Sequence, residues 1–483
     1  MAGESSIKVG KKAFLLSGGI VLLLMIVSGI LTIALPSGTF ERISDGGRTL
    51  VVNGSYQELP KGNYPFWRWF TAPVEILFGP ENITPIVLCL FIIIVGGSIA
   101  VLEYAGVMEA LIGFLVIRFA KKKYLLLAII IFFFMFVSAF VAIYEGMIPM
   151  IIFIIPIAIS LGWDSLTGLG MSLLPLAFGL AASVTNPFTV GLAQQIADLP
   201  MFSGSLLRIL FFLVVYGGLS FFVIRYAKKV ESNPAHSLCY AEDEGLRQKL
   251  RSGIGGVQDM TEKNKLKALI WFVVCISLAI FAVMLSSQLP GLSSLAFPVM
   301  GLFFLIGGLG GGAWAGIKAG AIGRSFGKGV RNMIPGIVLV LMAYSVKHII
   351  VTGMIMDTIL YMAAELIRQA PPMAAAFLVY AATLVMNFFI GSASAKAMLM
   401  MPLLTPLADI VGITRQTAVM AFDFGDGFSN MIFPTNPSLL IGLSFSVVGY
   451  TKWMHWTWKL QLGILLTTSA FLAFAVLIHF GPF

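Results

Sequence analysis

Charged side chains are scarce in this sequence. Only 11% of the 483 residues are Asp, Glu, Lys or Arg, and 58% are hydrophobic, whereas a soluble domain is typically about 25% charged. A soluble protein of this length needs more polar surface than so few charged side chains supply. The composition therefore excludes a soluble globular protein and indicates a polytopic membrane protein.

Cysteine and histidine are also rare. The three cysteines lie far apart without a Cys-x-x-Cys pair and the four histidines are scattered, so neither a disulfide framework nor a thiolate metal site is indicated. The chain lacks the His-Glu-x-x-His motif of zinc proteases, and the segment from Gly323 to Gly329 lacks the spacing of a phosphate-binding loop. We therefore expect no transition metal, no cofactor, no ATP-driven pump and no membrane enzyme.

Apolar runs of about 20 residues, long enough to cross a bilayer core, define the organisation of the chain. The first run, 13–36, is too long for the apolar region of a signal peptide, so we interpret it as an uncleaved helix with a cytoplasmic N-terminus. The predicted order is a cytoplasmic tail (1–12), a first scaffold helix with an external interfacial segment (13–82), a first repeat (83–226), a cytoplasmic linker (227–265), scaffold helices (266–333) and a second repeat (334–483).

Basic residues outnumber acidic ones by nine, an excess that in a soluble protein would suggest nucleic acid as a partner. With the predicted spans, 22 of the 31 Lys and Arg residues fall on the same side as the N-terminus, as the positive-inside rule requires of the cytoplasmic face. We therefore expect no nucleic-acid partner. The chain is predicted to lie in the lipid of a bacterial cytoplasmic membrane, with its C-terminus outside.

The string Thr-Asn-Pro occurs once in each half of the chain. Its asparagines are Asn186 and Asn436, which are 250 positions apart (436 minus 186). A proline inside a span removes a backbone donor, and the neighbouring Thr and Asn can replace the lost hydrogen bonds and supply ligand oxygens. A single such motif could be a simple kink. Two in matching positions favour discontinuous helices that line a cavity.

Each Thr-Asn-Pro lies about 40 residues after an interrupted apolar region. The interruptions are Tyr144-Glu145-Gly146, within 124–160, and Gly391 to Lys396, within 372–410, and their polar residues suit re-entrant hairpins better than single long spans. The predicted fold is an all-α polytopic membrane protein with an inverted-topology repeat, two re-entrant helical hairpins (124–160 and 372–410) and two discontinuous transmembrane helices (171–197 and 419–450).

Ionisable residues within spans are energetically costly, so each has a functional and a structural interpretation. Lys396, beside Ser392 and Ser394, could bind a carboxylate or could snorkel towards a water-filled vestibule. Glu145 could carry a proton, bind a cationic group or form a structural ion pair. Lys347 lies near the end of its span, where snorkelling is the favoured interpretation.

Asp423 and Asp426 are one helical turn apart and precede the second Thr-Asn-Pro. The adjacent glycines could expose carbonyl groups to a small cation such as Na⁺, or could simply break the helix. The candidate substrate-binding residues are Glu145, Thr185, Asn186, Ser392, Ser394, Lys396, Thr435 and Asn436, and the candidate cation-coupling residues are Ser183, Asn186, Asp423, Asp426, Ser429, Asn430 and Asn436.

Several of these segments resemble a known family. The chain is similar to the YfcC-type transporters, relatives of the anaerobic four-carbon-dicarboxylate carriers. The resemblance rests on Asn186-Pro187-Phe188, Gly191 to Gln194, Ser203 to Arg208, Asn387-Phe388-Phe389, Thr414-Arg415-Gln416 and Phe424 to Asn430.

The resemblance implies the ion transporter superfamily fold, with a scaffold that typically dimerises and a transport domain that moves as an elevator. It also implies a secondary carrier driven by Na⁺ or H⁺, with a small-molecule substrate held between the hairpin tips and the broken helices. Substrates in this broad group include dicarboxylates, short-chain fatty acids and, for the arginine/ornithine exchangers that YfcC proteins resemble, basic amino acids.

Two departures from the family pattern bear on the substrate. Relatives have Glu-Glu where this chain has Glu145-Gly146, and Ser-Gly-Ser-Gly-Gln where it has Ser392 to Lys396. Both changes make the pocket less favourable for a cationic amino acid, whereas Asp423, where relatives have Gln, has the opposite effect. We favour a carboxylate-bearing substrate, either a mono- or dicarboxylate or an amino acid. A basic-amino-acid exchanger, a passive channel and a sensor without flux are the alternatives.

Overall fold

The computed structural model describes residues 11–45, 48–62, 64–79, 82–107, 110–111, 114, 119–251, 262–287 and 296–481. The predicted tail, 1–12, therefore lies almost wholly outside the described residues. Within them, ten helices are long and apolar enough to cross a membrane. These spans are Phe14–Ala34, Ile83–Tyr104, Lys123–Val141, Ser165–Ala182, Ser205–Ser232, Lys263–Val283, Ala319–Thr352, Pro372–Phe389, Ala393–Val411 and Tyr450–Leu477. The prediction of a polytopic helical membrane protein is confirmed.

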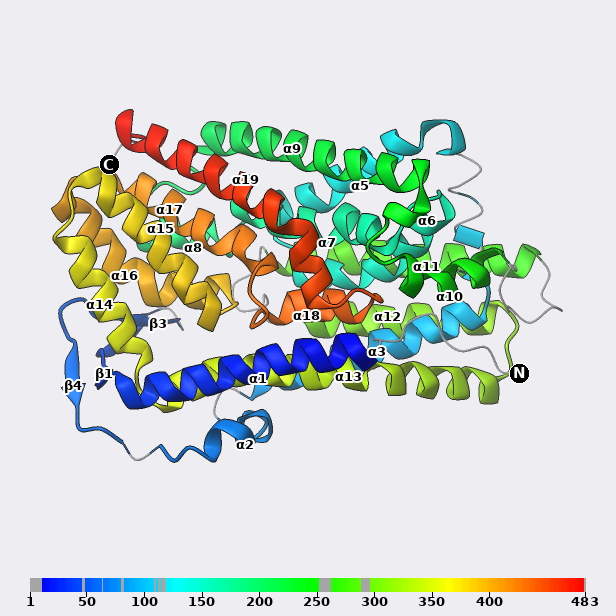
Figure 1. The fold of residues 1–483 in the computed structure, drawn as a ribbon, viewed down its shortest axis with the longest axis horizontal. Coiled ribbons are helices and arrows are strands. Elements are labelled where there is room, and N and C mark those ends of the chain that lie inside the picture. Colours follow the sequence, from blue (N-terminus) through cyan, green and yellow to red (C-terminus); the bar gives the residue numbers. More distant parts are fainter. Residues whose placement is uncertain are drawn as a thin grey trace.

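One group of long helices forms a layer along one side of the molecule (Figure 1). It comprises α1 (Lys11–Ala34), α3 (Ile83–Tyr104), α11 (Glu262–Ser287), α12 (Ala296–Trp314) and α13 (Ala319–Thr352). Helix α13 packs against α1 and α3, and α12 packs against α3 and α11. A Cβ atom on Gly329 would lie 2.2 Å from the carbonyl oxygen of Gly96, so glycine permits the close crossing of α13 and α3.

The segment between α1 and α3 is not helical throughout. Strands β1 (Ser37–Thr39) and β4 (Gln57–Leu59) form one antiparallel ribbon, and β2 (Arg42–Asp45) and β3 (Arg48–Val51) form another. A short helix, α2 (Arg68–Glu75), follows. The ribbons are held against α14 (Met356–Arg368), where Asp357 accepts from the Phe40 amide at 2.9 Å and pairs with Arg42 at 2.8 Å.

Each predicted hairpin region consists of two helices separated by a break. In the first half, α5 (Lys123–Phe136) continues as a π-helix, η2 (Val137–Val141), and the chain turns at Ala142, whose φ is 67°. It resumes as the 3₁₀ turn η3 (Glu145–Met150), which leads into α6 (Ile151–Ser160). A separate short turn, η1 (Ala120–Lys122), lies before α5. In the second half, α15 (Pro372–Phe389) and α16 (Ala393–Val411) flank a break at residues 390–392.

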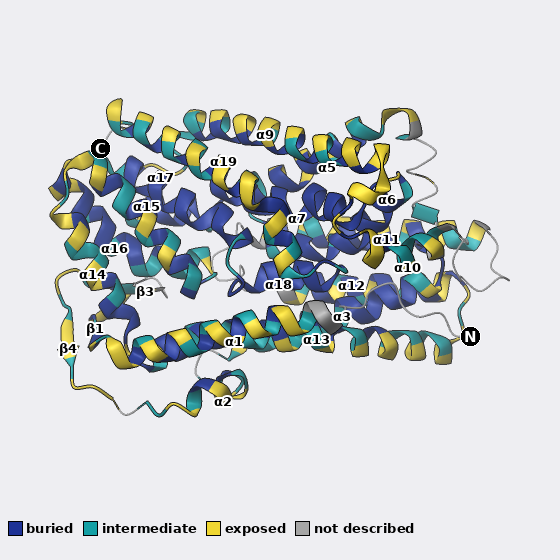
Figure 2. Ribbon diagram, in the orientation of Figure 1, coloured by how far each residue is buried: buried dark blue, intermediate teal, exposed yellow. Residues whose placement is uncertain are grey.

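Two discontinuous helices follow the hairpins and occupy the centre of the molecule. Helix α7 (Ser165–Ala182) is separated from α8 (Val190–Ile196) by the first break, residues 183–189, and every residue of α7 is buried (Figure 2). Helix α17 (Arg415–Gly427) and its 3₁₀ extension η6 (Phe428–Met431) are separated from α18 (Pro437–Ser444) by the second break, residues 432–436. Helices α9 (Ser205–Ser232) and α19 (Tyr450–Leu477) lie along the opposite edge from α13 (Figure 1).

Both discontinuous helices begin earlier than the predicted 171 and 419. The side chain of Asp164 accepts from the Thr167 amide at 2.8 Å, and that of Thr414 accepts from the Thr417 amide at 3.1 Å. These N-caps satisfy otherwise unpaired amides and so extend each helix by a turn or more beyond its apolar run. Helix α13 runs through the predicted boundary at 333–334, because the turns that carry Arg324, Lys328 and Arg331 are continuous with the apolar segment that follows them.

The linker between the halves is ordered around a buried carboxyl group. It contains η4 (Pro234–His236) and α10 (Tyr240–Arg251), and Asp243 on α10 accepts from the Ser165 amide at the start of α7 at 2.9 Å. Lys452 on α19 reaches the same region, donating to the Leu238 carbonyl at 2.9 Å and pairing with Glu242 at 2.5 Å. The linker therefore connects α7 to α19 at one end of the molecule.

The docking of α10 is expected to depend on pH. Burial raises the pKa of Asp243 from the usual 3.8 to about 6, so between those values the folded protein binds a proton that the unfolded chain does not. Stability at this site therefore falls as pH rises from about 4 to about 6. We expect wild type to lose thermal stability over this range relative to Asp243→Asn. Parallel unfolding profiles in detergent from pH 4 to 7 would contradict this expectation.

Candidate functional site

The ends of α7 and α17 meet in the middle of the protein. They approach from opposite ends of the molecule (Figure 1), since α7 begins beside the linker at Asp243 while α17 begins beside Phe480, whose carbonyl accepts from Thr414 at 2.7 Å. A Cβ atom on Gly427 would lie only 2.1 Å from the backbone nitrogen of Ala181. The two breaks are therefore brought together across a contact that only glycine allows.

The first break is closed by the tip of the first hairpin. Thr185 donates from its hydroxyl to the Phe140 carbonyl at 3.0 Å, and Asn186 donates to the Ser138 carbonyl at 3.0 Å. The Asn186 side-chain oxygen accepts from the amides of Phe188 and Thr189, at 2.9 and 3.2 Å. The Thr-Asn-Pro motif thus replaces the backbone hydrogen bonds that the interrupted helix cannot make.

The second break uses the same motif with more polar partners. Thr435 donates to the Phe388 carbonyl at 2.5 Å, and the Asn436 side chain accepts from the Ser438 amide at 2.9 Å and donates to Asn430. Asn387, at the end of α15, donates to Ser429 at 2.5 Å and to the Asp426 carbonyl at 3.0 Å.

The two halves repeat at the level of individual hydrogen bonds. In the first half, Ser138 donates to the Leu176 carbonyl at 2.6 Å. Asn387 lies 249 positions after Ser138, and Asp426 lies 250 positions after Leu176. Asn387 likewise donates to the Asp426 carbonyl. The N-caps Asp164 and Thr414 are also 250 positions apart. The duplicated sequence string is therefore part of a duplicated structure.

Lys396 lies inside this framework and is fully buried. Its ammonium group forms an ion pair with Asp426 and donates to the side-chain oxygen of Asn387. Neighbouring Ser394 donates to the Phe188 carbonyl at 2.9 Å and so links the second hairpin to the first break. From the sequence, Lys396 is a candidate ligand for a substrate carboxylate, whereas in this structure its charge is matched by Asp426.

Asp423 is one turn further from the break and is also buried. Neither of its carboxylate oxygens has a hydrogen-bond partner among the described residues, and it interacts electrostatically with Arg208 on α9. Arg208 donates to the Ser203 carbonyl, while its Nε and Nη1 have no partner within the described part of the chain. Asp423 therefore lies in the electrostatic field of both Arg208 and Asp426, without a hydrogen bond from the described residues.

A cavity of about 670 Å³ lies between the second break and the helical layer of α3 and α13. Ser392, Thr435, Asn436 and Glu145, all predicted substrate-binding residues, line it. The lining does not include Lys396 or the first-break residues Ser183, Thr185 and Asn186, nor the cation-coupling candidates Asp423, Asp426, Ser429 and Asn430. The predicted site residues are thus divided between an open cavity and a buried polar network.

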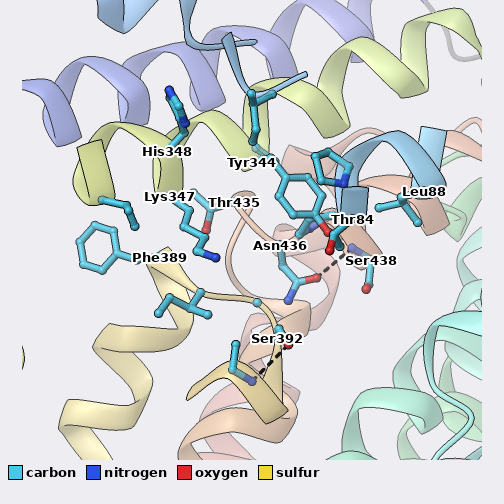
Figure 3. A pocket seen from close by; sticks show the side chains of 18 of the residues that line it. Thr84, Leu88, Tyr344, Lys347, His348, Phe389, Ser392, Thr435, Asn436 and Ser438 are labelled. Carbon is cyan, nitrogen blue, oxygen red and sulfur yellow. Dashed lines mark hydrogen bonds between the residues drawn. The ribbon is translucent and has the colours of Figure 1, made fainter. Parts of the chain in front are cut away.

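The helical layer contributes Tyr344, Lys347 and His348 from α13 and Thr84 from α3. Figure 3 shows Lys347 reaching from α13 into the cavity towards Thr435 and Asn436. His348 lies 3.5 Å from Glu75 on α2, near the cavity wall formed by Ile76 and Gly79. The sequence signal for Lys347 was its position inside an apolar run, but its role as a cavity residue depends on long-range packing.

Three helices begin at the wall of this cavity. They are α3, α16 and α18, and the residues at or beside their first turns, Thr84, Ser392 and Ser438, line the cavity. Helix N-termini carry partial positive charge, which favours an anion. With the Lys347 ammonium group added, the cavity is suited to a carboxylate, while Glu145 supplies one negative group for a cationic substituent.

Comparison with known proteins identifies relatives along nearly the whole chain. The family model described as "DcuC: C4-dicarboxylate anaerobic carrier" matches residues 14–477. A protein of Escherichia coli (strain K12) named "Putative basic amino acid antiporter YfcC" is 29% identical over 393 residues, covering 78% of this chain and 74% of that protein.

Two solved transporter structures are similar over most of the chain. The Alcanivorax borkumensis YdaH transporter has a TM-score of 0.40 and 18% identity, covering 97% of this chain and 100% of that one. Neisseria gonorrhoeae MtrF has a TM-score of 0.42 and 14% identity, covering 98% and 96%. Because the family model spans almost all of the sequence, the resemblance to YfcC-type transporters is confirmed, and this multi-pass membrane protein belongs to the DcuC family of C4-dicarboxylate anaerobic carriers.

Proposed function

We propose that this protein is a secondary active transporter that moves a small carboxylate-bearing solute, coupled to Na⁺ or H⁺. The observation that carries the proposal is the cavity where Lys347 lies with the N-terminal ends of α3, α16 and α18. Half-helix N-termini in discontinuous membrane helices are well placed to bind anionic substrate groups. An amino acid is favoured over a dicarboxylate, because Glu145 lines the same cavity.

A basic amino acid exchanger is the second candidate. The E. coli relative carries the name of a basic amino acid antiporter, and Glu145 could pair with a guanidinium or ammonium group on the substrate side chain. The two candidates differ in what Glu145 binds. In a carrier of neutral amino acids it binds the α-ammonium group, whereas in an exchanger of basic ones it binds the side chain.

The cavity position suggests how transport proceeds. It lies between the helical layer of α3 and α13 and the unit that contains both breaks, so a sliding motion between the two would carry the substrate across the membrane. We propose an elevator mechanism with inverted repeats and re-entrant hairpins. We further propose that the protein is a homodimer in the bacterial cytoplasmic membrane, with a cytoplasmic N-terminus and an external C-terminus. The distribution of basic residues supports this orientation.

The coupling ion requires its own ligands. The first break has several hydroxyl oxygens, including those of Ser183 and Thr189, which are 2.6 Å apart. Hard cations prefer such oxygen ligands, together with backbone carbonyls. Within the described residues, no group of three His, Cys, Asp or Glu side chains could hold a metal ion. The first break is therefore the proposed place for Na⁺, if Na⁺ is the coupling ion.

Counterflow in proteoliposomes tests the proposed substrate class. Vesicles preloaded with an unlabelled solute are assayed for uptake of labelled neutral amino acids, arginine, ornithine, succinate and lactate. We expect uptake of an amino acid, and we expect Lys347→Met to raise its KM by roughly 10- to 100-fold, because a buried carboxylate would lose its charged partner. Glu145→Gln should weaken only substrates that carry an ammonium or guanidinium group.

Arg324→Met on the exposed part of α13 is the matched control and should leave the KM unchanged, since Arg324 does not line the cavity. An unchanged KM in Lys347→Met would remove Lys347 from the binding site. Conductance through single channels without counterflow for any solute would instead favour the passive channel.

A further inference from the structure

The buried charge pair is present in only one of the two repeats. Lys396 and Asp426 are paired at the second break. The residue 249 positions before Lys396 is Met147, and the residue 250 positions before Asp426 is Leu176. Both are buried in the first repeat. The two repeats therefore differ by a complete ion pair, with both charges present in one and both absent in the other.

The surroundings of the Lys396 ammonium group resemble those of a bound cation. It contacts oxygen atoms of Asp426 and Asn387, and the second Asp426 oxygen has no hydrogen-bond partner among the described residues. Asn387 is held in place by its own hydrogen bonds to Ser429 and Asn430, at 2.5 and 3.1 Å. Carboxylate and amide oxygens of this kind are typical ligands of hard cations.

The helix end adds to the attraction for positive charge. Asp426 lies in the last turn of α17, where the α-helix passes into the 3₁₀ turn η6, and the carboxyl end of a helix carries partial negative charge. Lys396 reaches this helix end from the first turn of α16, so its ammonium group neutralises both the carboxylate and the helix terminus. Broken helices in transporters commonly coordinate Na⁺ with such C-terminal ends.

We propose that the Lys396 ammonium group is a tethered cation that fills the cation site of the second break. In wild type, the ammonium group excludes an inorganic ion from Asp426 and Asn387. Replacing Lys396 with an uncharged residue turns the same oxygens into a site for Na⁺. This inference rests on the proposed function, because it places any coupling Na⁺ outside the second break.

Ion-dependent stability of the purified full-length protein tests this proposal without substrate. Thermal unfolding of wild type and Lys396→Met is measured in NaCl, KCl and choline chloride at equal ionic strength. We expect Na⁺ to stabilise Lys396→Met more than wild type, with a concentration dependence that saturates, because a ligand of the native state raises its stability by mass action. If Na⁺ also raises the unfolding temperature of wild type, that part of the increase comes from another site. It is removed when the wild-type increase is subtracted from that of Lys396→Met.

The chain itself provides the control, because the first repeat already has the uncharged combination. The double variant Lys396→Met with Asp426→Leu reproduces Met147 and Leu176 and should lose the added Na⁺ response. Lys396→Gln, which keeps a hydrogen-bond donor for Asp426, serves if the methionine variant folds poorly. Equal shifts in all three salts, or no difference between the single variants and wild type, would overturn the proposal. Substrate counterflow is measured separately, so its absence would affect the proposed function alone.

Discussion

Replacing Gly427 with alanine is expected to disrupt the centre of the protein. The new Cβ atom would lie 2.1 Å from the Ala181 nitrogen and 2.2 Å from its Cα. Both atoms belong to the backbone of α7, which is buried along its whole length and has no space to retreat. We expect a loss of about 1–3 kcal/mol or more in unfolding free energy, and loss of transport, because both breaks depend on this crossing.

The matched control is Gly463→Ala on α19, where an added Cβ atom would meet nothing within 4 Å. Alanine there should stabilise the helix by up to about 1 kcal/mol. Unfolding in detergent and counterflow in proteoliposomes measure both variants. If Gly427→Ala were as stable and as active as Gly463→Ala, the close crossing of α7 and α17 would be wrong.

Replacing Asp426 with leucine is the other change with a large expected effect. Lys396 would remain fully buried with the Asn387 amide oxygen as its remaining partner. Removal of one member of a buried ion pair typically costs about 3–5 kcal/mol, because the other charge is left uncompensated. We expect Asp426→Leu to be much less stable than wild type in thermal unfolding.

Adding Lys396→Met to Asp426→Leu should restore most of that stability, since no buried charge then remains. Asp409→Leu provides a surface comparison, because Asp409 pairs with Arg415 at 2.7 Å but is 48% exposed, and such pairs contribute about 0–1 kcal/mol. Additive losses in the double variant would show that Lys396 and Asp426 are not energetically coupled.

Local sequence signals predicted the elements of this site well. A duplicated Thr-Asn-Pro string indicated two discontinuous helices, and Thr185 and Thr435 both close their breaks against a phenylalanine carbonyl of the preceding hairpin. These features are readable because a proline within an apolar run disturbs the helix wherever the chain lies in space. Helix starts were less accurate, since the caps Asp164 and Thr414 lie outside the apolar runs.

The roles of the two intramembrane lysines could not be read from the sequence. Lys396 and Lys347 both interrupt apolar runs, and only packing shows that Lys396 is paired with Asp426 while Lys347 lines the cavity. The cavity joins Thr84, Lys347 and Asn436, which are separated by far more residues than a local pattern spans. Which helix ends line the cavity is therefore a property of the tertiary structure.

The hydrogen bond from Ser394 to the Phe188 carbonyl joins the tip of one repeat to the break of the other. Together with the contact of Gly427 on Ala181, it fastens the two repeats to each other at their most irregular points. Neither repeat can move away from the other without breaking these two contacts. In the proposed mechanism, access to the cavity would therefore change along the α13 wall, where α13 packs against α18.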